Sequence, residues 1–238
     1  MNNMRRFAMI GVTAALIMLG AGTGPGMAGP RAHVYLLRGL MNIFSLGMDT
    51  LAAQIERHGI NATVDNYADW QTLADHVAAA YRAGTEGPII LVGHSLGADA
   101  VMEMAAYLGK KGVPVALVIA FDGTKSLAAS GNIGRVINFT QRKYAFIRRG
   151  RGFHGLLANV DVTSDANINH LNIDKSERLH ARAIGAILAV VGVRHRSAAS
   201  VAHIHHAPAL SRGNHRANVA EPADSTRRQR GRRREAER

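Results

Sequence analysis

One serine of this chain stands in a setting that suits a nucleophile. The stretch IILVGHSLGADA, residues 89–100, runs from branched aliphatic residues into Gly93-His94-Ser95-Leu96-Gly97 and then into an alanine-rich segment. A serine hydroxyl is a weak nucleophile at neutral pH, so an acyl-transfer site must present it to a base and stabilise the oxyanion that forms. A tight turn between a strand and a helix presents the side chain, and the flanking glycines leave room for neighbouring backbone. The pattern predicts that Ser95 is a nucleophile; the alternative is an ordinary structural turn, because a short motif is weak by itself.

The elements around this turn alternate between strands and helices. Short apolar runs indicate strands, at residues 33–37, 61–67, 88–93, 114–122, 135–141 and 156–162. Residues that recur at helical spacing indicate helices, at residues 48–59, 70–84, 96–112 and 174–192. This alternation is typical of βαβ units. We therefore expect one α/β domain with a mostly parallel sheet of about six strands between layers of helices.

These residues carry a family resemblance. The sequence ILVGHSLGA resembles the nucleophile elbow of the α/β-hydrolase fold, and the core over residues 33–192 is similar to the thioesterase- and lipase-like bacterial members of that superfamily. The resemblance implies a three-layer α/β-hydrolase fold and a serine hydrolase with a Ser–Asp/Glu–His triad in that chain order. It implies attack on an ester or thioester carbonyl through an acyl-enzyme.

Two carboxylates compete for the role of the triad acid. Asp122 ends the strand after the elbow, 27 residues beyond Ser95. The carboxyl ends of neighbouring parallel strands share one crevice, so both side chains could reach it, and the thioesterase-like branch resembles this placement. Many other α/β hydrolases take the acid one strand later, which keeps Asp161 as the alternative, with Asp165 behind both.

The resemblance places the base just before the last helix, where His170 lies in NINHLNIDKSERL. Of the other histidines, five lie in the C-terminal tail, and the rest lie in the elbow, on predicted helices, before the first strand or in a glycine-rich loop. We expect His170 to take the Ser95 proton and return it to the leaving group, while the carboxylate fixes its tautomer.

The oxyanion hole needs one amide after the nucleophile and a second from the loop that leaves the first strand. Leu96 follows Ser95, and LLRGLMNIFSLG supplies the loop. Because Gly39 permits a sharp turn, we expect the Leu40 amide to be the second donor, with Met41 as the next choice.

The two ends of the chain differ in composition from the core. Arg5 and Arg6 precede an apolar run over residues 7–19, which predicts a secretory signal at 1–28 and a mature domain at 29–193, periplasmic or secreted from a bacterium, without a transmembrane segment. That domain carries 16 Lys and Arg against 13 Asp and Glu, whereas residues 194–238 carry 11 Arg against 4 acidic residues. The tail is therefore predicted to be disordered, with possible contacts to anionic polymers or membrane surfaces and no specific nucleic acid. The chain has no cysteine, which excludes thiol chemistry.

A second class of function remains open. The fold could have lost catalysis and serve as a binding protein that the basic tail tethers to anionic surfaces. Candidates for all three triad positions favour an enzyme that acts on a small acyl ester or thioester. No metalloprotease motif, phosphate loop or dinucleotide fingerprint stands in a supporting context in the sequence, so no cofactor is expected.

Overall fold

A parallel sheet forms the middle of the domain. The computed structural model describes residues 31–40 and 45–205; the expected signal peptide at 1–28, Met41 and residues 206–238 lie outside the described residues. The sheet has six strands in the spatial order β2-β1-β3-β4-β6-β8. The strands are β1 (Arg31–Arg38), β2 (Asn61–Asn66), β3 (Glu86–His94), β4 (Leu117–Phe121), β6 (Arg135–Thr140) and β8 (Leu156–Asp161).

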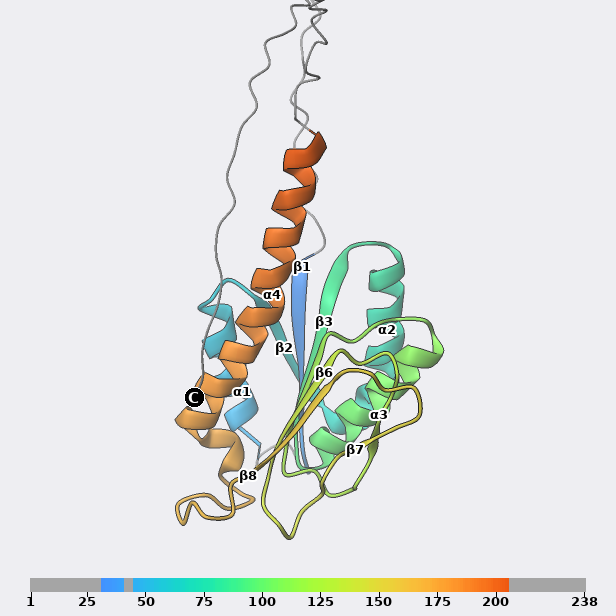
Figure 1. The fold of residues 1–238 in the computed structure, drawn as a ribbon. Helices are drawn as coiled ribbons and strands as arrows, with labels where there is room; N and C mark the ends of the chain where they lie inside the picture. The colour runs from blue at the N-terminus through green and yellow to red at the C-terminus, as the bar shows by residue number, and fades with distance from the viewer. Residues whose placement is uncertain (1–30, 41–44, 206–238) are drawn as a thin grey trace, which may run out of the picture. The chain divides into compact units, whose positions relative to one another are not determined.

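Helices cover both faces of this sheet (Figure 1). The helices are α1 (Gly47–Glu56), α2 (Trp70–Arg82), α3 (Leu96–Lys110) and α4 (Glu177–His205), with short 3-10 helices η1 (Tyr67–Asp69) and η2 (Ile173–Lys175). α2 and α3 pack on one face, and α1 and the first turns of α4 pack on the other. The expected three-layer α/β architecture is confirmed, and the pairs of neighbouring strands in the large sheet are all parallel.

Alternate residues of each strand enter the two layers of the core, because successive side chains of a strand point to opposite faces. In β3, Ile89 and Leu91 pack with α2 and α3, whereas Ile90 and Val92 pack with α1 and α4. All of these side chains are at most 1% exposed. A strand that is covered on both faces needs a continuous apolar run, which explains the aliphatic stretch before the elbow.

The register brings the carboxyl ends of the central strands to one edge of the sheet. His94 ends β3 and lies opposite Phe121, which ends β4. β4 and β6 are paired in the same direction. The residues that follow these strands, Ser95, Asp122 and Gln141, therefore emerge at one edge.

The last helix extends further than the sequence-based boundary. The tail was expected to begin at residue 194, but α4 continues to His205. The segment SAASVA at 197–202 is rich in alanine, a strong helix former, and a helix that is already nucleated extends at low cost. α4 therefore includes residues beyond the predicted helix, and the disorder of the tail stays a prediction.

Two connections lack the helices that usually join parallel strands. Between β4 and β6 the chain forms only the short strand β5 (Ala128–Ala129), and between β6 and β8 only the short strand β7 (Arg148–Arg149). These two strands pair with each other. No pattern in the sequence predicts this pair of strands. Its loops cover the α3 side of β6 with Ile147 and Phe153.

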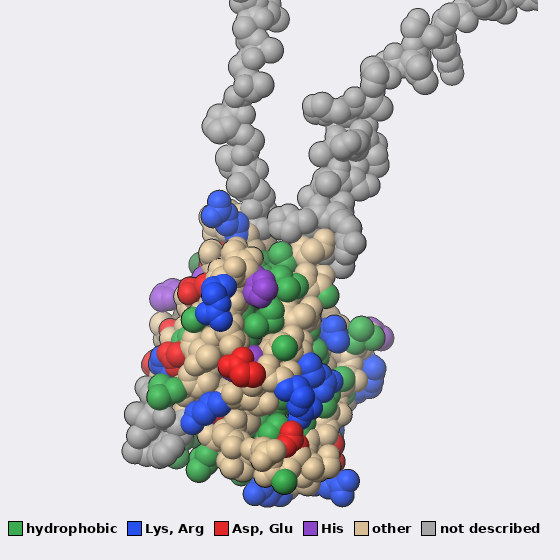
Figure 2. Space-filling view, turned by 90° about the vertical axis from the view of Figure 1, so that its left-hand side faces the viewer, with side chains coloured by type: hydrophobic (Ala, Val, Ile, Leu, Met, Phe, Trp, Pro, Cys, Tyr) green, Lys and Arg blue, Asp and Glu red, His purple; other side chains and the backbone are tan. Residues whose placement is uncertain are grey.

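The surface on the α1 and α4 side has mixed charge. Figure 2 shows basic and acidic side chains interspersed over this face. None of the helices in the described part of the chain is long and apolar enough to cross a membrane.

Candidate active site

Ser95 occupies a strained turn between β3 and α3. Its backbone has φ 57° and ψ −123°, a conformation that costs a non-glycine residue about 1–3 kcal/mol unless its surroundings hold it. The Ser95 amide donates a 2.9 Å hydrogen bond to the carbonyl of Phe121 in β4, and the Ser95 carbonyl accepts from the amides of Ala98 and Asp99 in α3. The hydroxyl does not cap the helix, so it can bond to another partner.

The glycines of the elbow are required by close backbone contacts. A Cβ atom at Gly93 would lie 2.2 Å from the carbonyl oxygen of Gly97. A Cβ atom at Gly97 would lie 2.1 Å from the carbonyl oxygen of Leu37 in β1. The serine is therefore flanked by glycines because α3 starts directly against β3 and β1, with no space for a side chain.

His170 lies beside the serine, on the loop between β8 and η2. The His170 Nε2 atom is 2.9 Å from Ser95 Oγ. The ring of Tyr144 stacks on the imidazole, with ring centroids 4.3 Å apart and planes 13° apart. The His170 side chain is 21% exposed, so one side of the ring is sheltered while solvent still reaches the group. The structure thus brings the expected base within hydrogen-bonding distance of the expected nucleophile.

Asp122 lies on the other side of His170. Its side chain is fully buried, and its Oδ2 atom is 3.6 Å from His170 Nδ1, which is an ion-pair distance but longer than a hydrogen bond. Gln141 holds the carboxylate from the far side: the Gln141 amide donates to Oδ1 at 2.8 Å and Gln141 Nε2 donates to Oδ2 at 2.7 Å. Hydrogen bonds of this kind are often long without substrate and tighten in the Michaelis complex.

The alternative acids are engaged in surface pairs. Asp161 accepts hydrogen bonds from the Thr163 amide at 2.8 Å and from Arg142 Nε at 2.9 Å. Hydrogen bonding by the Thr163 side chain, then by its amide and by Arg142, lowers the pKa of Asp161 to about 2. Asp165 pairs with Arg178 at 2.7 Å. Of the candidate acids, the structure brings Asp122 to His170.

The loop after β1 packs directly against the nucleophile. A Cβ atom at Gly39 would lie 3.0 Å from Ser95 Cβ. The Gly39 amide donates to Ser45 Oγ at 2.9 Å, so it is committed to that bond and Leu40 is the next amide along the loop. Leu96 is the first residue of α3, where amides have no partner within the helix. Leu96 therefore directly follows Ser95, and Leu40 directly follows Gly39, which packs against Ser95.

Asp99 and Gln141 support the site, although the sequence analysis missed both. The Asp99 carboxylate accepts from the amides of Thr124 and Lys125 at 2.9 and 3.0 Å, and also from the Thr124 hydroxyl. It therefore ties the loop after Asp122 to α3. A buried acid in the first turn of an otherwise apolar helix was a signal for Asp99. Nothing in the sequence alone marks Gln141, which lies far from Asp122 along the chain.

Replacing Gln141 with Met is expected to lower kcat/KM for an ester roughly 10-fold, because Asp122 loses one of its two donors and can turn away from His170. Methionine has a similar volume and suits a buried site, so the Tm should change little. The test is steady-state kinetics together with a thermal melt. Unchanged kinetics would show that the Gln141 side chain does not hold the carboxylate.

A second polar group is buried behind the elbow, and we call it the His94 cluster: Ser45, His94 and Asp174. His94 Nδ1 is 2.8 Å from Ser45 Oγ, and His94 Nε2 is 2.8 Å from the carbonyl oxygen of His170. Asp174 Oδ2 accepts from the Gly47 amide at 3.0 Å and lies 3.9 Å from His94 Nδ1. Burial lowers the pKa of His94 to about 4 and raises the pKa of Asp174 to about 6. The imidazole is therefore neutral at neutral pH.

The Asp174→Asn variant is expected to gain stability relative to the parent as the pH rises through the window between 3.8 and about 6. In that window the folded parent binds the Asp174 proton more tightly than the unfolded chain, so the parent loses stability as the carboxyl ionises. The lowered pKa of His94 has the opposite effect, but parent and variant share it. Across this pH window, the Tm of the variant minus the Tm of the parent should rise by roughly 5–10 °C. A difference that does not depend on pH would contradict this prediction.

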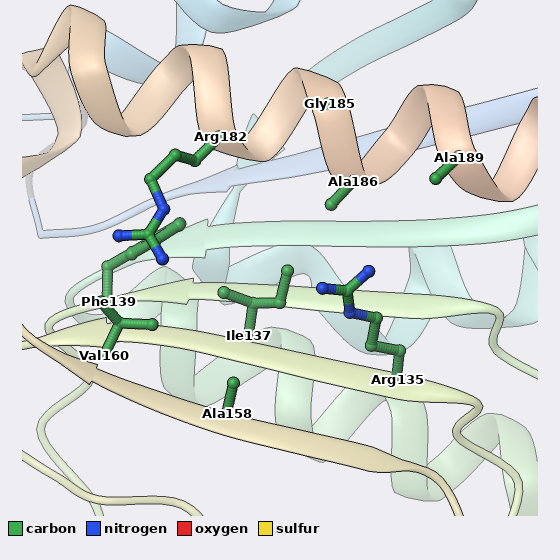
Figure 3. Close-up of a pocket in the computed structure, with 9 residues that line it drawn as sticks. All are labelled: Arg135, Ile137, Phe139, Ala158, Val160, Arg182, Gly185, Ala186 and Ala189. Carbon is green, nitrogen blue, oxygen red and sulfur yellow. The ribbon is translucent and has the colours of Figure 1, made fainter.

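Two of the cavities in the described part of the chain bear on the site, and Ser95 lines neither, although Leu96, the residue after it, lines one of them. A cavity of about 320 Å³ lies between α4 and strands β6 and β8, where the side chain of Arg182 reaches over the ring of Phe139 (Figure 3). Neither the serine, the histidine nor the aspartate of the site lines it. A smaller cavity of about 190 Å³ is lined by Leu96, Tyr67 and Trp70 among others. Within the described residues, no group of three or more His, Asp or Glu side chains is arranged to hold a metal ion.

Comparison with known proteins finds one family model and several distantly similar solved structures. The sequence model of the Thioesterase domain family matches residues 44–134, and no curated protein matches the chain. A putative hydrolase of the alpha/beta superfamily from Xanthomonas campestris pv. campestris has 18% identity and a TM-score of 0.40, over 67% of this chain and 99% of that one. An acetylxylan esterase has 13% identity and a TM-score of 0.43, over 69% and 100%.

A third solved structure is an extracellular alpha/beta-hydrolase from a Paenibacillus species, with 15% identity and a TM-score of 0.29 over 40% of this chain and 42% of that one. The parallel sheet, its two helical layers and the elbow between β3 and α3 are the features that define the fold. The structure therefore has an α/β-hydrolase-like fold, and residues 44–134 match the Thioesterase domain model.

Proposed function

We propose that the protein is a serine hydrolase that cleaves carboxylic esters or thioesters through an acyl-enzyme. Ser95 is the nucleophile, His170 is the base, and Asp122 is the acid that orients it. The observation that carries the proposal is the 2.9 Å approach of His170 Nε2 to Ser95 Oγ at a strained elbow. The thioesterase match over residues 44–134 supports the same class of reaction.

The proposed roles require a particular position for each proton. A carboxylate can only accept, so His170 Nδ1 carries its proton toward Asp122 and Nε2 presents a lone pair to the Ser95 hydroxyl. As Ser95 Oγ attacks the carbonyl carbon, its proton moves to Nε2. The Asp122 carboxylate stabilises the imidazolium that results. Proton transfer of this kind contributes about 10²- to 10⁴-fold in rate.

The negative charge that forms on the carbonyl oxygen must be stabilised by hydrogen-bond donors, which form the oxyanion hole. The amides of Leu96 and Leu40 would stabilise this oxyanion, and one such donor contributes about 10²- to 10³-fold. Collapse of the tetrahedral intermediate breaks the bond to the leaving oxygen or sulfur, which takes the proton from His170 Nε2. Water then repeats the sequence on the acyl group and releases the acid.

The cavity beside Leu96 supports a small substrate. Its volume of about 190 Å³ holds one modest group, and Tyr67 and Trp70 supply apolar surface there. The cation of Lys125 in its lining is paired with Glu103 at 3.0 Å. We infer that part of a small acyl substrate lies in this cavity. Aryl esters and acyl thioesters of increasing chain length would define its preference.

Reaction with a fluorophosphonate tests the proposal directly. The probe phosphonylates serines that a neighbouring base activates. Mass spectrometry of the labelled protein should place the adduct on Ser95 and on none of the other nine serines of the chain. Heat-denatured protein is the control and should not react. A native protein that stays unlabelled, or that is labelled elsewhere, would overturn the proposal.

We also propose that the protein is exported. The proposal rests on Arg5 and Arg6, the apolar run at 7–19 and the small residues that follow. Expression of the full chain in a Gram-negative host should yield a periplasmic product whose N-terminal residue is Gly29. An intact Met1 on a cytoplasmic product would contradict export.

A further inference from the structure

We propose that His94, the residue before the nucleophile, is a positioning residue that sets the base and the oxyanion loop together. This inference rests on the function proposed above. His94 is 1% exposed, and both of its ring nitrogens have hydrogen-bond partners. One partner is the main chain of His170, and the other is Ser45, which holds the turn after β1.

The partners fix the direction of every hydrogen bond in this chain of contacts. The carbonyl oxygen of His170 can only accept, so His94 Nε2 carries the proton. Because the ring is neutral, Nδ1 is then an acceptor and the Ser45 hydroxyl donates to it. Ser45 Oγ in turn accepts the Gly39 amide at 2.9 Å. Each donor has one acceptor, so the arrangement is fully satisfied.

The bond to His170 fixes the base where its loop is otherwise exposed. Leu171 is 57% exposed, and Asn169 is exposed as well. Local hydrogen bonds in this loop join its own residues: the Asn169 amide donates to Asn172 Oδ1, and the Leu171 amide donates to Asn169 Oδ1. The 2.8 Å bond from His94 Nε2 to the His170 carbonyl ties this locally bonded loop to β3. Because His94 directly precedes Ser95, this one hydrogen bond connects the main chain of the base to the residue next to the nucleophile. It therefore fixes the distance between the two groups.

The bond to Ser45 acts on the other half of the site. Gly39 lies against Ser95, since a Cβ at Gly39 would be 3.0 Å from Ser95 Cβ and 2.9 Å from the carbonyl oxygen of His94. Ser45 holds the Gly39 amide, and His94 Nδ1 fixes the Ser45 hydroxyl. The position of Leu40, the next residue, therefore depends on the same imidazole.

The His94 cluster has the residue types of a second catalytic triad, but its geometry does not fit that role. Asp174 Oδ2 is 3.9 Å from His94 Nδ1, and Ser45, not Asp174, is the hydrogen-bond partner of that nitrogen. Ser45 is 1% exposed and Asp174 is fully buried, so no substrate carbonyl could reach the Ser45 hydroxyl. His94 acts through His170 and the Gly39 turn.

Two substitutions at position 94 separate positioning from packing. Gln keeps a donor near the place of Nε2 and an acceptor for Ser45, whereas Leu keeps the bulk and loses both. We expect His94→Leu to lower kcat roughly 10- to 100-fold with KM changed less than about 3-fold, because small misplacements of catalytic groups cost this much. His94→Gln should recover kcat to within about 5-fold of the parent. Fluorophosphonate labelling rates should follow the same order.

His180 provides the matched control. It is also 1% exposed, and its ring nitrogens bond to Gln54 at 2.9 Å and to the carbonyl of Asp174 at 2.6 Å. It touches neither Ser95 nor His170 in these contacts. His180→Leu should lower the Tm by an amount similar to that for His94→Leu, yet leave kcat within about 3-fold of the parent. Equal losses of kcat in both Leu variants would overturn the proposal.

A measurement that needs no turnover completes the test. Nitrogen-15 NMR of the histidine side chains in the Ser95→Ala protein should show His94 as the neutral tautomer with its proton on Nε2. Ser45→Ala should shift the Nδ1 resonance and serves as the second variant if His94→Leu does not fold. A proton on Nδ1 would overturn the inference even in an active enzyme. If fluorophosphonate does not label the parent protein, the proposed function is overturned. The tautomer of His94 can still be observed in that case, so the two failures can be told apart.

Discussion

The Ser95→Ala variant is expected to hydrolyse an activated aryl ester with a kcat about 10⁴- to 10⁶-fold below that of the parent. Loss of the hydroxyl removes the covalent route, and the activity that remains must come from attack by water at the oxyanion site. Alanine fits the turn of a residue that is 8% exposed, so the loss should occur without unfolding. Initial rates and a thermal melt measure both quantities.

The control for this variant is Ser126→Ala, at an exposed serine after β4. Its rates should equal those of the parent. The His170→Ala variant should lose about as much activity as Ser95→Ala, and the double variant should lose little more, because the two groups act as one unit. If the loss of kcat in the double variant equalled the product of the two single losses, the nucleophile would have been assigned wrongly. A Ser95→Ala enzyme that keeps its kcat would show the same.

The Gly97→Ala variant is expected to lose about 3–5 kcal/mol of unfolding free energy, or to fail to fold. The added Cβ would lie 2.1 Å from the carbonyl oxygen of Leu37. Because the Cβ is fixed to the backbone of α3 and the oxygen belongs to the backbone of β1, they cannot move apart without separating α3 from β1. The Tm should fall by roughly 10 °C. Chemical denaturation gives the free energy, and circular dichroism shows whether the fold is retained.

Gly185→Ala is the opposite case and controls for the change from glycine to alanine. Gly185 lies within α4, and an added Cβ there meets nothing within 4 Å. Alanine should therefore stabilise the protein by about 0.5–1 kcal/mol through its helix propensity. If Gly97→Ala were as stable as Gly185→Ala, the close packing of the elbow would be ruled out.

The sequence predicted the elements of the fold well because each carries a strong periodic pattern. The aliphatic run before Ser95 became β3, and the strands at 135–141 and 156–162 became β6 and β8 with small shifts at their ends. The predicted strand at 114–122 is shorter, since β4 begins at Leu117. The charged, histidine-rich segment after residue 193 has little apolar periodicity, so the sequence predicts a helix only to residue 192, whereas α4 continues to His205.

The candidate site was less accessible to sequence reasoning than the fold. Ser95 could be found because its motif is local. His170 and Asp122 are brought together by the register of β3 and β4 and by the loop after β8, and they were assigned with help from a family resemblance. Gln141 and Ser45 escaped notice because hydrogen bonds between distant residues leave no pattern in a single sequence. His94 was expected to pack beside the site, and the structure adds both of its bonds.

Ser95 is not alone in its unusual backbone, since Asp122 also has a positive φ, of 46°. Glycine would adopt either conformation with less strain. A laboratory selection for heat resistance alone would therefore favour glycine at both positions. Such a variant would be more stable but would lose the hydroxyl and the carboxylate of the site. Efforts to make this protein more robust should exclude these two positions and select for turnover at the same time.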